Sequence, residues 1–231
     1  MDFSGVIATL FNTIAQATND GGVLNWLSSK YEAGGFFMHP ILGCLILGLA
    51  FCFERLWTLT RSKTNTKKFI VQVRRALDDG GIEQAKQVCA NTRGPVASVF
   101  HAGLLRAEEG LEAAEKAIIA YGGIEMGFLE RGLIWISLFI SLAPMLGFTG
   151  TVQGMIAAFD AIKEAAQISP AIVADGIAVA LLTTLFGLVV AMILQVFYNY
   201  LVSRIDSLVS DMEEASIELI DALYEFKTRK K

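Results

Sequence analysis

The sequence has little histidine, little cysteine and no excess of basic residues. It contains two histidines, His39 and His101, and three cysteines, Cys44, Cys52 and Cys89. The histidines lie far apart without a nucleophile constellation, and the cysteines form neither a CxxC pair nor the spacing of a disulfide framework. The net charge of −4 gives no indication of a nucleic-acid partner. These absences argue against an enzyme, a metal centre and any bound cofactor.

Charged residues are scarce, and apolar residues dominate the composition. Hydrophobic residues make up 54% of the chain and charged residues 18%, with a mean hydropathy of +0.51. Soluble domains carry charge on about 25% of their residues. The composition therefore predicts an integral membrane protein.

The segment 1–22 lacks the basic region and the long apolar core of a cleaved signal peptide. Its apolar residues recur at helical steps before the glycine pair that ends the pattern; they are Phe3, Val6, Ile7, Leu10, Phe11 and Ile14. This spacing predicts an amphipathic helix in the membrane interface, on the periplasmic side. A short soluble packing helix is the alternative.

The first candidate span covers 36–59. It is uncharged from 40 to 53 and is followed by Glu54 and Arg55, with Trp57 behind them. About 20 mainly apolar residues are needed to cross the hydrocarbon core. The run reaches that length when Glu54 and Arg55 neutralise each other at the inner interface and Trp57 serves as an aromatic interface anchor.

Two longer uncharged runs cover 132–159 and 176–203. At 1.5 Å per residue each spans about 42 Å, more than one hydrocarbon thickness, so both helices should continue past the membrane. The region 61–131 and the tail 204–231 carry helical apolar spacing, and 160–175 is a short periplasmic connection. The prediction is an all-α integral membrane protein with three transmembrane helices, two of them long and extending into a helical cytoplasmic domain.

Lysine and arginine predict the orientation. Of the 19 basic residues, only Lys30 precedes the first span, and only Lys163 lies between the second and third. The densest clusters are "RSKTNTKK" directly after the first span and "KTRKK" at the C-terminus. The positive-inside rule then places the N-terminus outside and the C-terminus in the cytoplasm, as three spans require.

Small and hydroxyl-bearing residues recur at helical spacing on both long spans. On the second they are Gly147, Thr151, Gly154 and Ala158; on the third they are Gly176, Ala180, Thr184, Gly187 and Ala191. Such stripes permit close packing of membrane helices, and they also suit a lined cavity. The two interpretations are compatible, and periodicity leaves both open.

Neither long span contains Asp, Glu or His. Proton transport through hydrocarbon needs a group that binds and releases protons, which intramembrane Asp, Glu or His normally supplies. Asp160, Glu164 and Asp175 lie at the ends of the spans or in the connection between them. If this protein conducts protons, the carboxylate must come from another chain.

Two motifs resemble the ExbB, TolQ and MotA family of proton-channel subunits, and most closely ExbB. "LGFTGTVQGMIAAFDAI" is similar to the family's LGLLGTVxGM element, and "DGIAVALLTTLFGLVVAMILQVFYNYL" is similar to its GIAxALxxTxxGLxxAIPAxxxYN element. The "FERLW" after the first span and the "RGP" of the middle region also match. The resemblance covers roughly 40–210.

The resemblance implies an inner-membrane protein of a Gram-negative bacterium that forms a pentamer around the membrane helices of a two-copy ExbD- or TolR-like partner. The partner's membrane Asp carries the proton, and a TonB-like periplasmic protein receives the work for transport across the outer membrane. The family's two polar pore positions map onto Thr151 and Thr184. The predicted proton pathway comprises both threonines, the neighbouring Thr183 and the small residues Gly147, Gly154, Ala158, Ala180, Gly187 and Ala191.

Several alternatives stay open. Three spans resemble ExbB or TolQ rather than the four-span MotA, and a TolQ-like or gliding-motor-like member fits the same motifs. Val179 stands where ExbB and TolQ commonly carry Glu, which strengthens the need for an acid from the partner. Sodium is an alternative to the proton, since threonine-lined walls suit either ion. A structural scaffold whose small-residue faces only pack is the alternative from another functional class.

Overall fold

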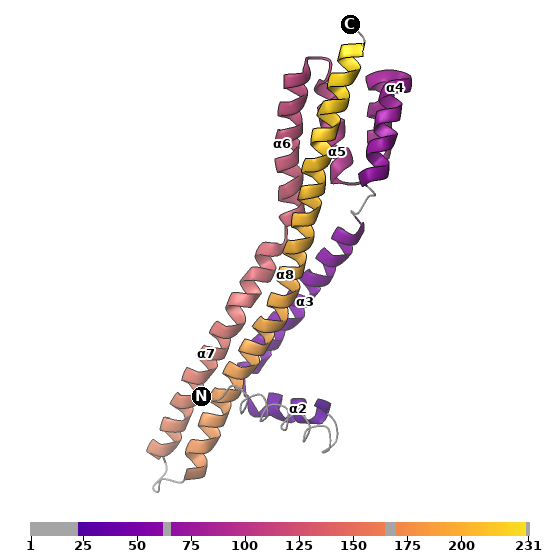
Figure 1. The fold of residues 1–231 in the computed structure, drawn as a ribbon. Helices are drawn as coiled ribbons and strands as arrows, with labels where there is room; N and C mark the ends of the chain where they lie inside the picture. Colours follow the sequence, from indigo (N-terminus) through magenta and orange to yellow (C-terminus); the bar gives the residue numbers. More distant parts are fainter. Residues whose placement is uncertain (1–22, 62–65, 165–169, 230–231) are drawn as a thin grey trace, which may run out of the picture. The chain divides into compact units, whose positions relative to one another are not determined.

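The structure, a computed structural model, describes residues 23–61, 66–164 and 170–229, and every regular element in these ranges is an α-helix (Figure 1). The all-α fold class predicted from the sequence is confirmed. The amphipathic helix predicted for 1–22 lies outside the described residues. In chain order the helices are α2 (Val23–Ala33), α3 (Met38–Arg61), α4 (Thr66–Asn91), α5 (Pro95–Arg106), α6 (Leu111–Glu130), α7 (Leu133–Glu164) and α8 (Pro170–Arg229).

Three helical stretches of the described chain are long and apolar enough to cross a membrane, and they lie within 38–91, 111–163 and 173–228. They contain nearly all of the three predicted spans. Both ends of the predicted connection at 160–175 are helical, since α7 continues to Glu164 and α8 begins at Pro170. The depth of each helix in the bilayer and the side on which each connection lies stay predictions.

The chain divides into two compact units. The first combines the described residues up to Leu49 with Ser137–Gln195. It contains α2, the first half of α3, most of α7 and the first part of α8. Close helix packing holds it together: Gly48 of α3 leaves room for the side chain of Leu194 on α8. Its buried residues include Met38, Ile41, Cys44, Ala143, Val190 and Leu194.

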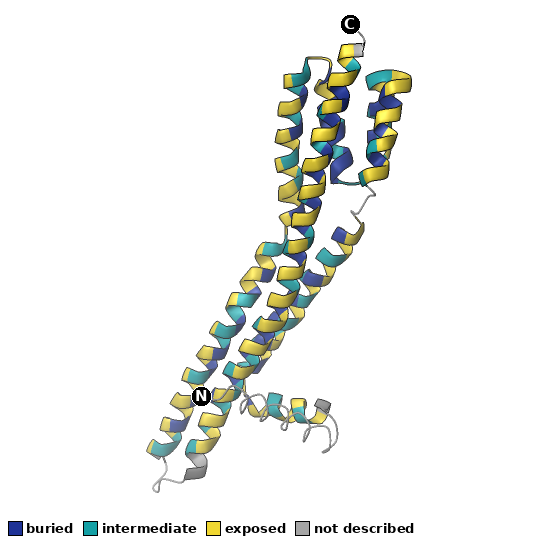
Figure 2. Cartoon of the chain, in the orientation of Figure 1, coloured by how far each residue is buried: buried dark blue, intermediate teal, exposed yellow. Residues whose placement is uncertain are grey.

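The second unit combines Ala50–Ile136 with Val196–Lys231, of which the described residues form the second half of α3, all of α4, α5 and α6, the start of α7 and the end of α8. The helix α5 packs against both α4 and α6 and is mostly buried (Figure 2). In the core of this unit the ring centroids of Phe69 and Phe100 lie 5.4 Å apart. The core also contains Leu77, Cys89, Leu104, Ile118, Leu219 and Leu223. The unit is thus a helical bundle around an apolar core.

Two glycines interrupt the helices of the second unit. Gly81 has φ +71° within α4, and Gly132 has φ +97° between α6 and α7. Both values lie in the left-handed region, where any side chain with a Cβ atom is strained. The chain therefore changes direction at Gly81, and α7 starts as a new helix after Gly132.

Candidate functional site

The small-residue stripes predicted on the second and third spans meet each other inside the first unit, where α7 and α8 lie side by side (Figure 1). A methyl group added at Gly187 would lie 2.6 Å from the carbonyl oxygen of Ala143, and one added at Gly147 would lie 2.8 Å from that of Thr183. Carbon and oxygen atoms in contact lie about 3.3 Å apart or more. Glycine is therefore required at both positions for the two backbones to come this close.

The same contact continues along the helices. A methyl group added at Gly154 would lie 2.9 Å from the carbonyl oxygen of Gly176 and 3.2 Å from the Cβ atom of Ala180. One added at Gly176 would lie 2.5 Å from the Cβ atom of Ala158. We call these facing residues the α7–α8 contact; they are Ala143, Gly147, Gly154, Ala158, Gly176, Ala180 and Gly187.

The α7–α8 contact supports the helix-packing interpretation of the stripes. Ala158 and Ala180 are buried, with exposed fractions of 4% and 3%, because each faces the other helix of the same chain. Ala191, at the end of the α8 stripe, is half-buried. A role of these residues in an ion pathway stays a prediction.

The two threonines that the motifs singled out lie together at the edge of this contact. The hydroxyl oxygens of Thr151 and Thr184 are 3.4 Å apart, on different helices, and both residues are only partly buried. The hydroxyl of Thr184 donates across the contact to the carbonyl oxygen of Gly147 at 3.3 Å, and that of Thr151 donates to Phe148 in its own helix. A hydroxyl has one hydrogen and two lone pairs, so both oxygens keep acceptor capacity for a visiting donor.

Other polar residues of the two spans are placed differently. Thr183 is fully buried, and its hydroxyl donates to the carbonyl oxygen of Ala180 at 2.9 Å. Thr149 is exposed and donates to Met145 at 2.8 Å, one turn back in its own helix. Such bonds satisfy a hydroxyl locally without any functional role. Only Thr151 and Thr184 are thus brought together across the helices.

A hollow of about 110 Å³ lies beside the contact, lined by Gln153, Val179 and Thr183 together with Phe36 and Phe37. A water molecule occupies about 30 Å³ in the liquid, so a few waters fit in this volume. Val179 contributes an apolar side chain to this lining. The hollow is therefore polar only through an amide and a hydroxyl.

No acidic or basic side chain reaches the α7–α8 contact in the described chain. Asp160 and Asp175 are exposed and lie beyond its end. The described residues also contain no cluster of three or more His, Cys, Asp or Glu side chains that could hold a metal ion. The contact offers hydroxyl oxygens and close-packed backbone, and any titratable group must be brought to it.

The predicted interface residues lie in the second unit. Arg55 Nε is 3.1 Å from Glu54 Oε2, which gives an ion pair without hydrogen-bond geometry. The Arg55 side chain is 14% exposed and lies against Gly132, where an added methyl group would be 2.5 Å from Nε. Trp57 is 70% exposed, as expected for an anchor at a membrane surface. The pairing of Glu54 with Arg55 follows the prediction, and their depth in the membrane stays a prediction.

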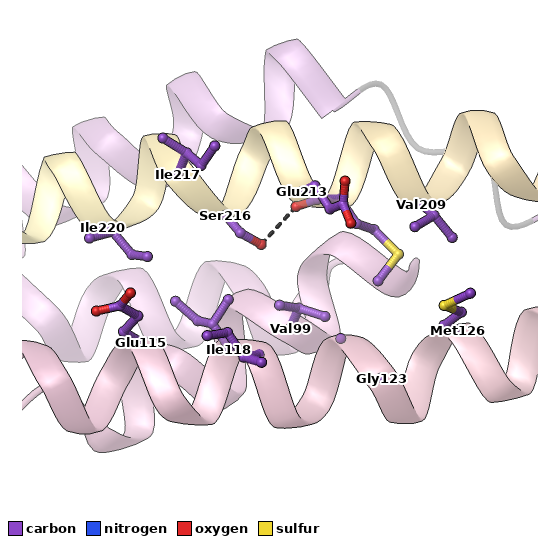
Figure 3. A pocket seen from close by; sticks show the side chains of 13 residues that line it. Val99, Glu115, Ile118, Gly123, Met126, Val209, Glu213, Ser216, Ile217 and Ile220 are labelled. Carbon is purple, nitrogen blue, oxygen red and sulfur yellow. Dashed lines mark hydrogen bonds between the residues drawn. The ribbon is translucent and has the colours of Figure 1, made fainter.

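One feature of the second unit was missed from the sequence. A groove of about 490 Å³ runs between α6 and α8 with Val99 of α5 at its base (Figure 3). Its apolar lining comes from both helices, and Glu115 and Glu213 also line it. The apolar spacing of the tail was visible in the sequence, but Ile217 of that stripe is 63% exposed. The sequence did carry a signal for this groove: the apolar stripe of the tail is wider than the single face that the helix buries.

Comparison with known proteins gives one consistent result. A model of the MotA/TolQ/ExbB proton channel family matches residues 91–214. The chain is 30% identical over 212 residues to an ExbB homolog of Methanothermobacter thermautotrophicus, covering 91% of this chain and 71% of that protein. It is 26% identical over 217 residues to the biopolymer transport protein ExbB of Salmonella typhimurium, covering 85% and 88% of the two chains.

A shorter match reaches the Tol-Pal system protein TolQ of Haemophilus influenzae, 36% identical over 87 residues and covering 38% of each chain. The matched family comprises proton channels rather than enzymes. Together with three helices able to cross a membrane, these matches indicate a multi-pass membrane protein. The resemblance found in the two sequence motifs is confirmed, and the chain belongs to the MotA/TolQ/ExbB proton channel family.

Proposed function

We propose that this chain is the inner-membrane stator subunit of a proton-driven motor in a Gram-negative bacterium. Copies of it form an oligomeric ring, expected to be a pentamer, around the membrane helices of an ExbD-like partner. Proton flow past the partner's membrane Asp is converted into mechanical work on a TonB-like system that serves transport across the outer membrane. The N-terminus is periplasmic and the C-terminus cytoplasmic, as the distribution of lysine and arginine indicates.

The pair formed by Thr151 and Thr184 is the observation that carries this proposal. Their hydroxyl oxygens are 3.4 Å apart and partly accessible, in two spans without any charge. A protonated carboxyl group can donate to one hydroxyl oxygen, and a carboxylate can accept from the other after the hydroxyl hydrogen turns. The pair therefore offers the same site to both protonation states of a partner Asp.

The neutral wall around this pair has a physical purpose. A bare ion pays a large desolvation cost in an apolar path, whereas a protonated carboxylic acid is neutral and pays much less. An apolar wall thus admits the protonated Asp and obstructs leakage of free ions. The transported ion in this proposal is H⁺; Na⁺ would need oxygen ligands that replace its hydration, which two hydroxyls do not supply alone.

Substitution of the threonines by valine tests the proposal, because valine keeps the shape and removes the oxygen atom. Thr151→Val and Thr184→Val, each reconstituted in vesicles with the partner, should lose proton flux by about tenfold or more, as expected when one polar contact to a moving charge is removed. Thr149→Val is the matched control, since its hydroxyl bonds only within its own helix. Size-exclusion chromatography should show normal assembly for all three variants.

A structural scaffold without conduction is the second candidate, and the α7–α8 contact favours it. Helix packing alone accounts for glycine at positions 147 and 187. The same valine variants separate the two functions: a scaffold keeps its activity in cells when both hydroxyls are removed. The protein reconstituted without its partner should pass no protons under the motor proposal, and flux from the chain alone would refute the need for a borrowed acid.

A further inference from the structure

The groove between α6 and α8 has apolar walls that the described residues leave uncovered. Ile119 and Met126 of α6 are 67% and 41% exposed, and Ile217 of α8 is 63% exposed. Figure 3 shows side chains from both helices, among them Ile118 and Met126 of α6 and Val209 and Ile220 of α8, lining the groove. Exposed apolar surface of this kind, rimmed by polar groups, is typical of a protein interaction site.

The groove carries two carboxylates without partners. Glu115 on α6 and Glu213 on α8 line it, and neither takes part in an ion pair within the described chain. The hydroxyl of Ser216 is already used, because it donates to the carbonyl oxygen of Met212 at 2.7 Å (Figure 3). No basic residue of the described chain lines the groove. An occupant that fits it combines apolar and basic side chains.

The chain itself carries a face of this kind on α4. Lys67, Val71 and Arg75 are spaced four residues apart, so they lie on one side of the helix. All three are exposed, Val71 at 50%, and the described structure shows no ion pair for Lys67 or Arg75. The neighbouring Arg74 is turned elsewhere, since its guanidinium bonds Glu225 at 2.7 Å. We call these three residues the basic α4 face.

We propose that the groove binds the basic α4 face of a second copy of this chain, with Val71 against the apolar wall and Lys67 and Arg75 toward Glu213 and Glu115. The two surfaces are different, so the contact is heterologous and generates a ring when its rotation closes. The inference deepens the homo-oligomeric part of the proposed function and rests on it. A second copy is favoured over an unrelated protein because one chain supplies both complementary surfaces.

A photocrosslinker in the groove identifies the occupant. With p-benzoylphenylalanine in place of Ile119 in the full-length protein in membranes, illumination should give an adduct of two copies. Mass spectrometry should map the second attachment point to residues 66–79. Ile124 is the matched control, since it is 52% exposed on the same helix and does not line the groove. An adduct with another protein or with lipid, or attachment outside α4, overturns the proposal.

Charge reversal tests the chemistry of the contact. Glu115→Lys with Glu213→Lys should lower the Ile119 adduct yield about tenfold or more, as expected for close charge pairs at an interface. Lys67→Glu with Arg75→Glu should do the same, and all four substitutions together should restore the yield. Glu214→Lys, exposed on α8 outside the groove, should have no effect. Circular dichroism shows whether each variant is folded, and folded variants with an undiminished yield refute the pairing.

The outcome separates this inference from the proposed function. If the adduct maps elsewhere while the threonine variants lose proton flux, the interface is wrong and the motor proposal stands. If the adduct maps to α4 while the threonine variants keep full flux, the interface stands and the motor proposal falls.

Discussion

Replacement of Gly187 by alanine should force α7 and α8 apart. The added methyl group would lie 2.6 Å from the carbonyl oxygen of Ala143 and 3.2 Å from the Cα atom of Gly147. Both neighbours belong to the backbone, so no flexible side chain can move aside. To restore a carbon–oxygen distance of about 3.3 Å, the helices must separate locally by about 0.7 Å.

The magnitude follows from the packing that this separation removes. A gap of 0.5–1 Å forfeits about a quarter to a half of the dispersion energy of each contact, and overpacking typically costs about 1–3 kcal/mol. Alanine also gains up to about 1 kcal/mol over glycine from helix propensity. Gly43→Ala on α3 is the matched control, because nothing lies within 4 Å of the added group. The gain in helix propensity is common to both variants, so the difference between their stabilities measures the packing cost at Gly187 alone.

Thermal unfolding of both variants in detergent measures this difference. At about 2–4 °C per kcal/mol for a chain of this size, Gly187→Ala should unfold several degrees below Gly43→Ala. Gly147→Ala should behave like Gly187→Ala, since its methyl group meets the backbone of Thr183 and Thr184. Equal midpoints for Gly187→Ala and Gly43→Ala would show that the backbones do not approach as described.

Three further outcomes are expected. Burial raises the pKa of the Cys89 thiol from its ordinary value of 9.0 to about 12, so Cys89 should resist maleimide at pH 8 until the protein unfolds. The free energy of unfolding should also fall as the pH rises above 9, because the unfolded chain releases the Cys89 thiol proton there while the folded chain keeps it up to about pH 12. Rapid maleimide labelling of the folded protein would contradict both statements. Lys86→Met should lower the unfolding midpoint more than Arg74→Met, since the Lys86 side chain is 13% exposed and the Arg74 side chain 50%; the reverse order would refute that ranking. Gly81→Ala should destabilise the protein by about 1–3 kcal/mol, because φ +71° with ψ −163° is a conformation that essentially only glycine adopts. Gly81→Asn should lose about as much, and variants as stable as the parent would exclude backbone strain at this position.

The helices were predictable from the sequence, but their ends were not. Hydropathy marks where a chain leaves hydrocarbon, whereas a helix continues as long as its backbone bonds are satisfied. The helix α7 therefore runs through Asp160 and Lys163, and α8 begins at Pro170, a residue suited to a first helical turn because it lacks an N–H group. Both helices thus extend beyond the uncharged runs, as their length predicted.

The candidate site was predictable in part. Periodicity placed Gly147, Thr151 and Gly154 on one face of one helix, but it gives no information on what that face contacts. Only the structure shows that the α7 stripe meets the α8 stripe of the same chain. Thr183 and Thr184 are adjacent in sequence, and a turn of about 100° per residue is enough to bury the first and leave the second partly accessible. The groove carboxylates Glu115 and Glu213 are 98 positions apart and carry no shared motif.

The α7–α8 contact is built almost entirely from residues that have no side-chain torsion angles. Glycine and alanine cannot change rotamer, so no side-chain rearrangement can absorb a displacement at this contact. Under mechanical load α7 and α8 move as one rigid unit, and any displacement must occur at the connections or between neighbouring subunits. In the motor proposed above, such a rigid pair of helices would transmit work without losing it to bending.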